Sequence, residues 1–400
     1  MKRNMIHTPE GVRDIYGNEL ERKFSCKEQI HSVLQSYGFH DIQTPTFEFF
    51  DIFSNEVGTT PSKELYKFFD KEGNTLVLRP DFTPSIARCA AKYFMEDATP
   101  IRLCYEGSAF TNGSELQGKF KETTQMGAEL IGDNTVIADA EMICMVIEAL
   151  KSVGFVEFTV SIGEIDYFKG MCEEAGLNEE TIATLRKYVS AKNYFGAEEA
   201  LVHRGVEEKY LDALVKVSDI CTIKELAELK KNIHNEKSLS AIQRLEEIYR
   251  VIEMYGYEDY VSIDLGMLSK FHYYTGVIFK VYTYGVGDAI VKGGRYDYLL
   301  SQFGKDAPAI GCVFLVDEIM NALRAQKKLP VIASKEHWIV YEEKDLSRAI
   351  TRLKELRKQN IFAVNIPITT FPCKADKTPV DKETIQSYAE KNHVTQVEFI

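Results

Sequence analysis

Residues 168–255 form a charged stretch with helical periodicity, and this stretch separates two regions that alternate in the manner of β-strands. Segments such as NEETIATLRKYVS and SLSAIQRLEEIYRVIEMY place apolar residues three or four positions apart, the spacing of one helix face. Strand-like segments precede it (IRLCYEGSAF, TQMGAELIG) and follow it (YVSIDLG, HYYTGVIFKVYTYG, AIVKGG). We therefore expect one antiparallel sheet flanked by helices and interrupted by a helical insertion.

The ends of the chain have patterns of their own. Residues 18–37 predict an amphipathic helix that Gly38 ends, and within FHDIQTPTFE we expect a strand that closes on Pro45. ELYKFFDKEGNTLVLRP indicates a hairpin that turns at residues 72–74. After the link QKKLPVIASKEH, a β-α-β unit, a helix and a strand indicate a small α/β domain. The expected fold is α+β, with a core over 1–325 and a C-terminal domain over 331–400.

Charge and cysteine usage exclude several functions. The net charge is −12, and residues 331–400 hold 11 Lys+Arg against 10 Asp+Glu, which is a poor surface for nucleic acid because phosphate neutralisation supplies most of that affinity. The eight cysteines are scattered without a C-x-x-C pair, and the eight histidines lack metal-ligand spacing. No apolar run approaches the roughly 18 residues that span a bilayer. We expect a cytoplasmic protein with reduced thiols, no metal, no cofactor, no nucleic-acid partner and no membrane contact.

Five short segments narrow the fold further. They are LRPDFT (78–83), CYEGSAFTNGSELQGKFKETTQMGAELIG (104–132), HYYTGVIF (272–279), GGRYD (293–297) and PAIG (308–311). Their order and spacing resemble those of histidyl-tRNA synthetases, which are class II aminoacyl-tRNA synthetases, over roughly residues 5–325. The resemblance implies a class II synthetase-like sheet flanked by helices.

The same resemblance implies a histidine site. The matching positions are Asp81, Thr83, Gln125, Glu129, Tyr273 and Tyr274. The residue types suit the ligand, because an ammonium requires carboxylate, carbonyl or hydroxyl acceptors and an imidazole N–H suits Glu129 or a tyrosine hydroxyl. The alternative interpretation makes the two tyrosines core aromatics and Glu129 a solvated residue. Arg295 could line the pocket or brace the sheet, and the sequence leaves both open.

Three positions depart from the synthetase pattern. The family holds arginines for ATP where this chain has Thr111, Ser269 and Glu318. Activation of an amino acid by ATP depends on electrostatic stabilisation at phosphorus, and one such arginine is worth about 10³–10⁵ in rate. We therefore expect no adenylation and no catalytic residue.

A synthetase-like core without these arginines and with a short C-terminal domain is similar to the regulatory subunits of ATP phosphoribosyltransferase. That family implies a non-catalytic chain acting in the first step of histidine biosynthesis. It implies assembly with a short-form catalytic subunit into a hetero-octamer built on dimers, and feedback inhibition by histidine. The alternatives are a functional histidyl-tRNA synthetase and a synthetase-like histidine-binding module that serves another partner.

Overall fold

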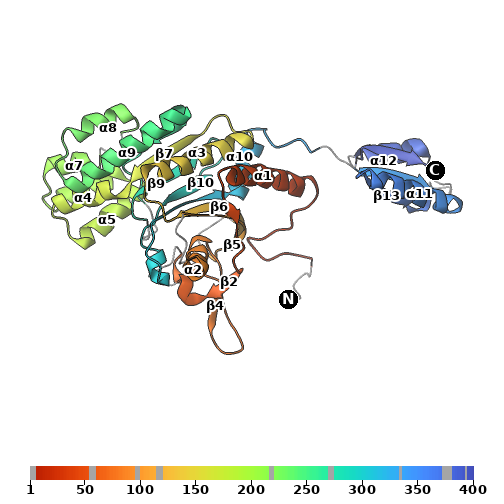
Figure 1. Cartoon of the computed structure of the whole chain (residues 1–400), viewed down its shortest axis with the longest axis horizontal. Helices are drawn as coiled ribbons and strands as arrows, with labels where there is room; N and C mark the ends of the chain where they lie inside the picture. The colour runs from red at the N-terminus through yellow and green to blue at the C-terminus, as the bar shows by residue number, and fades with distance from the viewer. Residues whose placement is uncertain are drawn as a thin grey trace. The chain divides into compact units, whose positions relative to one another are not determined.

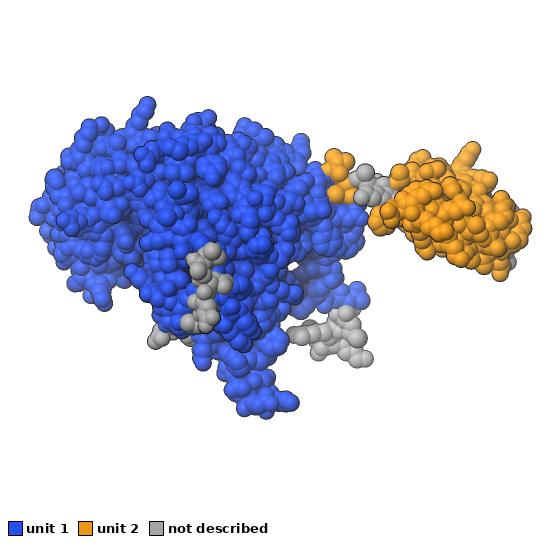
Figure 2. Space-filling model, in the orientation of Figure 1, with its two compact units in different colours: residues 1–330 blue, residues 331–400 orange. Residues whose placement is uncertain are grey.

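The computed structural model describes residues 6–53, 60–94, 100–113, 120–215, 220–268, 274–332, 336–371, 381–391 and 394–400. The chain divides into two compact units, residues 1–330 and residues 331–400, coloured separately in Figure 2. None of the described helices is both long enough and apolar enough to cross a membrane.

An eight-stranded sheet organises the first unit, in the order β1-β5-β6-β11-β10-β9-β7-β8. The central strands pair antiparallel, whereas β1 and β8 join the two edges in parallel. The bounds are β1 (His40–Asp41), β5 (Ile101–Phe110), β6 (Glu122–Ile131), β7 (Thr159–Glu164), β8 (Val261–Ile263), β9 (Val277–Tyr282), β10 (Val291–Arg295) and β11 (Ala309–Leu315). The predicted antiparallel sheet is confirmed for the central strands, and strands from both sides of the insertion build it.

One face of this sheet packs against four helices (Figure 1). They are α1 (Gly17–Ser36), α3 (Val136–Ser152), α9 (Glu236–Tyr255) and α10 (Val316–Ala325). Alternate residues such as Met126, Leu130 and Phe314 point into this layer and are fully buried. Because side chains alternate along a strand, the residues between them lie on the opposite face of the sheet. We call that opposite face the open face.

The open face carries a smaller layer, made of α2 (Thr83–Tyr93) and the three-stranded sheet β2-β4-β3. The bounds of these strands are β2 (Phe47–Phe49), β4 (Thr75–Leu78) and β3 (Lys67–Phe69). Phe82 stacks on Tyr105 of β5 with ring centroids 4.4 Å apart, which fixes the start of α2 against the sheet. The strand predicted to close on Pro45 corresponds to β1, which already ends at Asp41, and β2 begins after Pro45 in a different sheet.

The predicted helical insertion is a set of short helices that leads into α9, and all of them except α7 have a side-chain N-cap. They are α4 (Ile165–Glu174), α5 (Glu179–Ser190), α6 (Tyr194–Val202), α7 (Glu208–Leu214) and α8 (Ile223–Lys230). The side chain of Asn235 caps α9, and Gly256 ends it at φ 73°, a backbone conformation that glycine adopts without strain. Ser238 Oγ donates to the Tyr167 carbonyl at 3.0 Å, so α4 and α9 are tied together in one core.

The second unit is a three-stranded parallel sheet in the order β13-β12-β14 with helices packed on it. Its elements are β12 (Glu336–Tyr341), α11 (Leu346–Lys358), β13 (Phe362–Pro367), α12 (Lys382–Lys391) and β14 (Gln396–Phe399). The predicted β-α-β unit corresponds to β12, α11 and β13.

A buried charge cluster braces the first unit. Asp139 of α3 is fully buried and accepts from Arg295 Nη2 at 2.5 Å and from Arg244 Nε at 2.8 Å. We predict that Asp139→Asn lowers the free energy of unfolding by about 3–5 kcal/mol, because it removes the carboxylate that two guanidinium groups share and leaves Arg295 with Asp297 at 3.2 Å. Denaturant unfolding measures this change. Lys231→Ala, which removes the exposed pair with Glu228, is the control and should change the same quantity by less than about 1 kcal/mol.

Candidate functional site

A cavity of about 190 Å³ lies between the open face of the sheet and the N-terminal end of α2. Strands β6, β10 and β11 supply much of its wall. Its lining residues are Thr60, Pro80, Asp81, Thr83, Thr111, Gln125, Glu129, Tyr274, Lys292, Tyr296, Gly311, Cys312, Val313 and Leu315. Most of its polar side chains belong to the segments that the sequence singles out, so the fold brings distant motifs to one place.

Glu129 is the centre of the hydrogen bonding in this cavity. It is 1% exposed, and its carboxylate accepts from Thr83 Oγ1 at 2.8 Å and from Tyr296 Oη at 2.5 Å. Burial raises the pKa of Glu129 to about 8, against the opposing effect of the two hydroxyl donors. The interpretation of Glu129 as a solvated residue is therefore wrong.

Two glycines lie beside Glu129 on the neighbouring strands, and Gly311 lines the cavity. Gly311 of β11 pairs with Glu129 in register, and Gly294 of β10 pairs with Gly311. A Cβ on Gly311 would overlap the Glu129 carboxylate, and a Cβ on Gly294 would lie 2.9 Å from the Tyr274 ring. A larger residue at position 311 would displace the Glu129 carboxylate, and one at position 294 would displace the Tyr274 ring, so both glycines allow these two lining side chains to keep their positions.

Asp81 and Gln125 contribute acceptors at the wall. Asp81 Oδ1 accepts from the backbone N–H groups of Phe82 and Thr83, at 2.6 and 3.2 Å, which holds the carboxylate at the start of α2. Gln125 Oε1 is buried and has no hydrogen-bond partner within the described residues. A buried acceptor without a partner costs free energy, so this oxygen suits an N–H group that a ligand brings.

The structure places most of the predicted ligand residues around this one cavity: Asp81, Thr83, Gln125, Glu129 and Tyr274 all line it. Tyr274 is half-buried, and besides lining the cavity it packs against two hydrophobic clusters. Tyr273 lies outside the described residues.

The three departures from the synthetase pattern are placed as follows. Thr111 lines the cavity, whereas Glu318 lies on the first turn of α10 and is absent from its lining. Ser269 lies outside the described residues. Arg295 braces the sheet through Asp139 and does not line this cavity, which decides between the two roles that the sequence left open.

Two residues of the site escaped the sequence analysis. Tyr296 lies within the GGRYD segment and donates to Glu129, and Lys292 lies just before it on β10. The alternation of side chains along β10 is the sequence signal that points to both residues. Gly294, Lys292 and Tyr296 are two residues apart and share one face, while Arg295 points to the other face.

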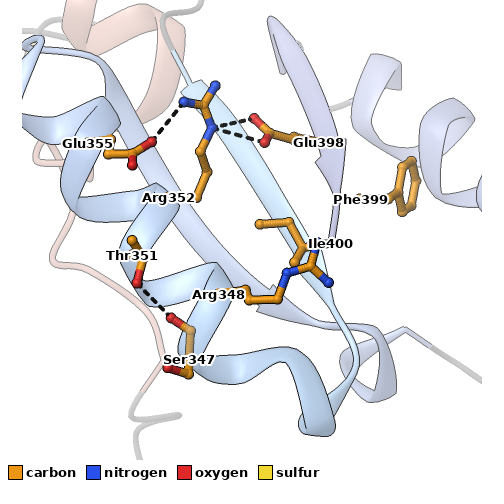
Figure 3. Close-up of a pocket in the computed structure, with 8 residues that line it drawn as sticks. All are labelled: Ser347, Arg348, Thr351, Arg352, Glu355, Glu398, Phe399 and Ile400. Atoms are coloured by element: carbon orange, nitrogen blue, oxygen red, sulfur yellow. Dashed lines mark hydrogen bonds and ion pairs between the residues drawn. The ribbon is translucent and has the colours of Figure 1, made fainter.

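Other hollows hold charges that are largely paired within the protein. In the second unit, a hollow of about 400 Å³ is lined by Arg352, whose Nε donates to Glu398 at 2.9 Å and whose Nη1 donates to Glu355 at 3.2 Å (Figure 3). In the first unit, a polar cavity of about 260 Å³ is lined by Glu164, whose Oε2 is buried without a hydrogen-bond partner among the described residues.

One group of side chains among the described residues has the donor types of a metal site. His31, Asp41 and Cys104 place their donor atoms within 4.8 Å of one another. However, His31 Nε2 and Asp41 Oδ1 already form a 2.6 Å hydrogen bond, and burial raises the pKa of the Cys104 thiol to about 12. Since a thiol must ionise to bind a metal, the trio is better explained as a hydrogen-bonded network.

Comparisons with known proteins agree on one family. The family model for histidyl-tRNA synthetase matches residues 11–319. A relative from Ruminiclostridium cellulolyticum, named ATP phosphoribosyltransferase regulatory subunit, is 36% identical over 99% of this chain and 97% of its own length. A relative of the same name from Acetivibrio thermocellus is 38% identical over 96% of this chain and 90% of its own length.

Two solved structures extend the comparison. The crystal structure of an ATP phosphoribosyltransferase regulatory subunit/histidyl-tRNA synthetase from Bacillus halodurans has a TM-score of 0.87 at 30% identity, covering 100% of this chain and 99% of its own. The histidyl-tRNA synthetase from Nostoc has a TM-score of 0.80 at 18% identity, covering 97% of this chain and 90% of its own, and this likeness concerns the fold alone.

The buried Glu129 carboxyl predicts a specific dependence of stability on pH. The unfolded chain loses this proton near the ordinary pKa of 4.5, but the folded chain keeps it until about pH 8. Stability should therefore fall as pH rises through this window, by up to about 1.4 kcal/mol for each unit of pKa difference. Glu129→Gln should become increasingly stable relative to the wild type between pH 5 and 8, as measured by denaturant unfolding.

Glu225 provides a control of opposite sign. Its pKa is lowered, chiefly by a hydrogen bond from the Cys221 backbone N–H, within the capping box of α8. Glu225→Gln should lose stability relative to the wild type as pH rises through about 4.5. A Glu129→Gln difference that stays constant with pH would contradict the assignment of Glu129.

Proposed function

This chain belongs to the family of ATP phosphoribosyltransferase regulatory subunits, which shares the histidyl-tRNA synthetase fold, and from this premise we propose that it is a non-catalytic, histidine-sensing subunit of that enzyme. It acts in histidine biosynthesis, where its effector is the end product. The observation that carries the proposal is the polar cavity centred on Glu129.

The cavity matches the groups of free histidine. Asp81 and Gln125 are acceptors for the ammonium, and Gln125 Oε1 has no hydrogen-bond partner among the described residues. Glu129 and Tyr296 form a polar end that is suited to the N–H of the imidazole. A site of this kind rejects apolar amino acids, because their binding would leave its buried polar groups without partners.

The lining also argues against chemistry on ATP. Thr111 lines the cavity at the position of a synthetase arginine, and a threonine hydroxyl cannot neutralise an α-phosphate. Among the described lining residues, Lys292 is the only cation, while Asp81 and Glu129 are acids. A lining with one cation and two acids favours a zwitterionic amino acid over a triphosphate.

The chain acts by assembling with the short-form catalytic subunit, in a hetero-octamer that contains dimers of this chain. Histidine regulates the complex by binding one quaternary state more tightly than another, and such coupling is typically about 1–3 kcal/mol. The ligand residues are sensor residues in this scheme and take no covalent part in the reaction.

Binding should be linked to a proton. The Glu129 carboxyl is largely protonated at pH 7 in the empty cavity, since burial raises its pKa to about 8. A ligand N–H that donates to this group stabilises the carboxylate, so histidine should release up to about one proton per site. Calorimetric titration in buffers of different ionisation enthalpy measures that number. Glu129→Gln should remove this contribution, and a wild-type enthalpy that does not depend on the buffer would contradict the linkage.

The regulatory role has a direct test. Mixed with the short-form catalytic subunit, the chain should confer transferase activity that histidine inhibits, and alone it should show no histidine-dependent exchange between ATP and pyrophosphate. Glu129→Gln should leave assembly and activity in place while raising the histidine concentration needed for inhibition by about tenfold or more. Histidine-dependent exchange at a synthetase-like rate would instead make the chain a functional histidyl-tRNA synthetase.

A further inference from the structure

The cavity has a direction along β10. Lys292 and Gly294 of β10 lie on the open face, and Tyr296, just after the end of β10, follows them two residues further on. Glu129, Gly311 and Gly294 lie side by side on three neighbouring strands, and Tyr296 donates to Glu129. Tyr296 therefore marks the end of the cavity that the proposed function assigns to the ring of the ligand. Lys292 marks the opposite end, and Gly311 lines the cavity on the neighbouring strand.

The spacing suits a ligand with a charge at one end and a ring at the other. Glu129 on β6 and Lys292 on β10 are separated by one strand, so their Cα atoms are about 10 Å apart across the sheet and about 7 Å apart along it. Both side chains line the cavity and shorten that span. Gln125 lies two steps beyond Gly127 on β6, toward the Lys292 end, so an acceptor for the ammonium lies near the cation.

The positive charge of Lys292 is only weakly neutralised by its neighbour. Its partner is Asp288, at 3.5 Å, and the two side chains are 32% and 44% exposed. An exposed pair of this kind is easily exchanged for a better one. Asp288 Oδ1 also accepts from the Ala289 backbone N–H at 2.8 Å, so the aspartate has another contact when Lys292 leaves it.

A second cation increases the positive potential at this end. Lys280 of β9 lies directly opposite Lys292 in the antiparallel register, and like charges in that position repel each other. The pKa of Lys280 is lowered, mainly by burial and then by Lys292, although Asp264 and Asp288 oppose the effect. An anion at Lys292 would relieve this repulsion. Lys280 itself does not line the cavity.

We propose that Lys292 forms a carboxylate subsite, which binds the α-carboxylate of the amino acid whose ring contacts Glu129 and Tyr296. The subsite makes the cavity selective for the complete amino acid over amines that carry the same ring. This inference rests on the proposed histidine-sensing function and adds a residue that the sequence motifs do not contain.

The experiment measures how tightly each of several protein variants binds ligands with and without a carboxylate. The proteins are the full-length wild type, Lys292→Met, which removes the charge and keeps the length, and Lys280→Met as the matched control on the neighbouring strand. The ligands are L-histidine, L-histidinol and histamine, of which the last two lack the carboxylate. Calorimetric titration at one pH and one salt concentration gives each dissociation constant.

The expected pattern is specific to the carboxylate. The wild type should bind histidine about tenfold or more tightly than histamine or histidinol, as expected for a charge-assisted hydrogen bond. Lys292→Met should lose about that factor for histidine and change by less than about threefold for histamine. Lys280→Met should keep the wild-type preference, and Lys292→Arg should retain most of it because the charge remains.

Each contrary outcome has its own meaning. Equal losses for histidine and histamine in Lys292→Met would overturn the subsite and leave histidine sensing intact. A wild type that binds histamine as tightly as histidine would do the same without any substitution. A wild type that binds none of the three ligands, alone or with the catalytic subunit, would overturn both the subsite and the proposed function.

Discussion

The buried carboxyl group of Glu129 is the interaction on which the arrangement of the cavity depends. It joins α2, through the Thr83 hydroxyl, to the segment after β10, through the Tyr296 hydroxyl. These two segments are separated by more than two hundred positions in the sequence, with the helical insertion between them. The carboxyl group can approach the sheet only because β11 carries Gly311 opposite it. Because Gly311 has no side chain, the Glu129 carboxyl group has room above β11.

This construction explains how a synthetase fold can work as a sensor. The sheet supplies a polar cavity, and in the proposed function its acceptors recognise an amino acid without any reaction taking place. Catalysis on ATP would require several cations at the same surface, but Lys292 alone supplies positive charge among the described residues that line the cavity. On the opposite face, Arg295 is committed to Asp139, so its charge holds α3 against the sheet and cannot reach a ligand on the open face. In the proposed function, the placement of charges distinguishes a sensor from a synthetase that has the same fold.

The sequence could predict much of this because several signals were local. Helical periodicity located α1 and α9, glycine marked the hairpin between β3 and β4, and ordered motifs indicated the synthetase-like fold. The separate strands β1 and β2 were harder to distinguish, since Thr44 and Pro45 between them do not reveal that the two strands join different sheets. The roles of Arg295, Tyr296 and Lys292 depend on which face of β10 each residue occupies. That parity becomes certain only when the register with β11 is known.

The central claim is that the open face of the sheet binds histidine in one orientation. The most direct measurement is a crystal structure of the full-length chain grown with L-histidine. We predict that the imidazole lies against Glu129 and Tyr296, that the ammonium lies near Asp81 and Gln125, and that the carboxylate contacts Lys292. Histidine bound elsewhere on the chain, or a cavity that stays without amino acid at saturating histidine, would contradict this account.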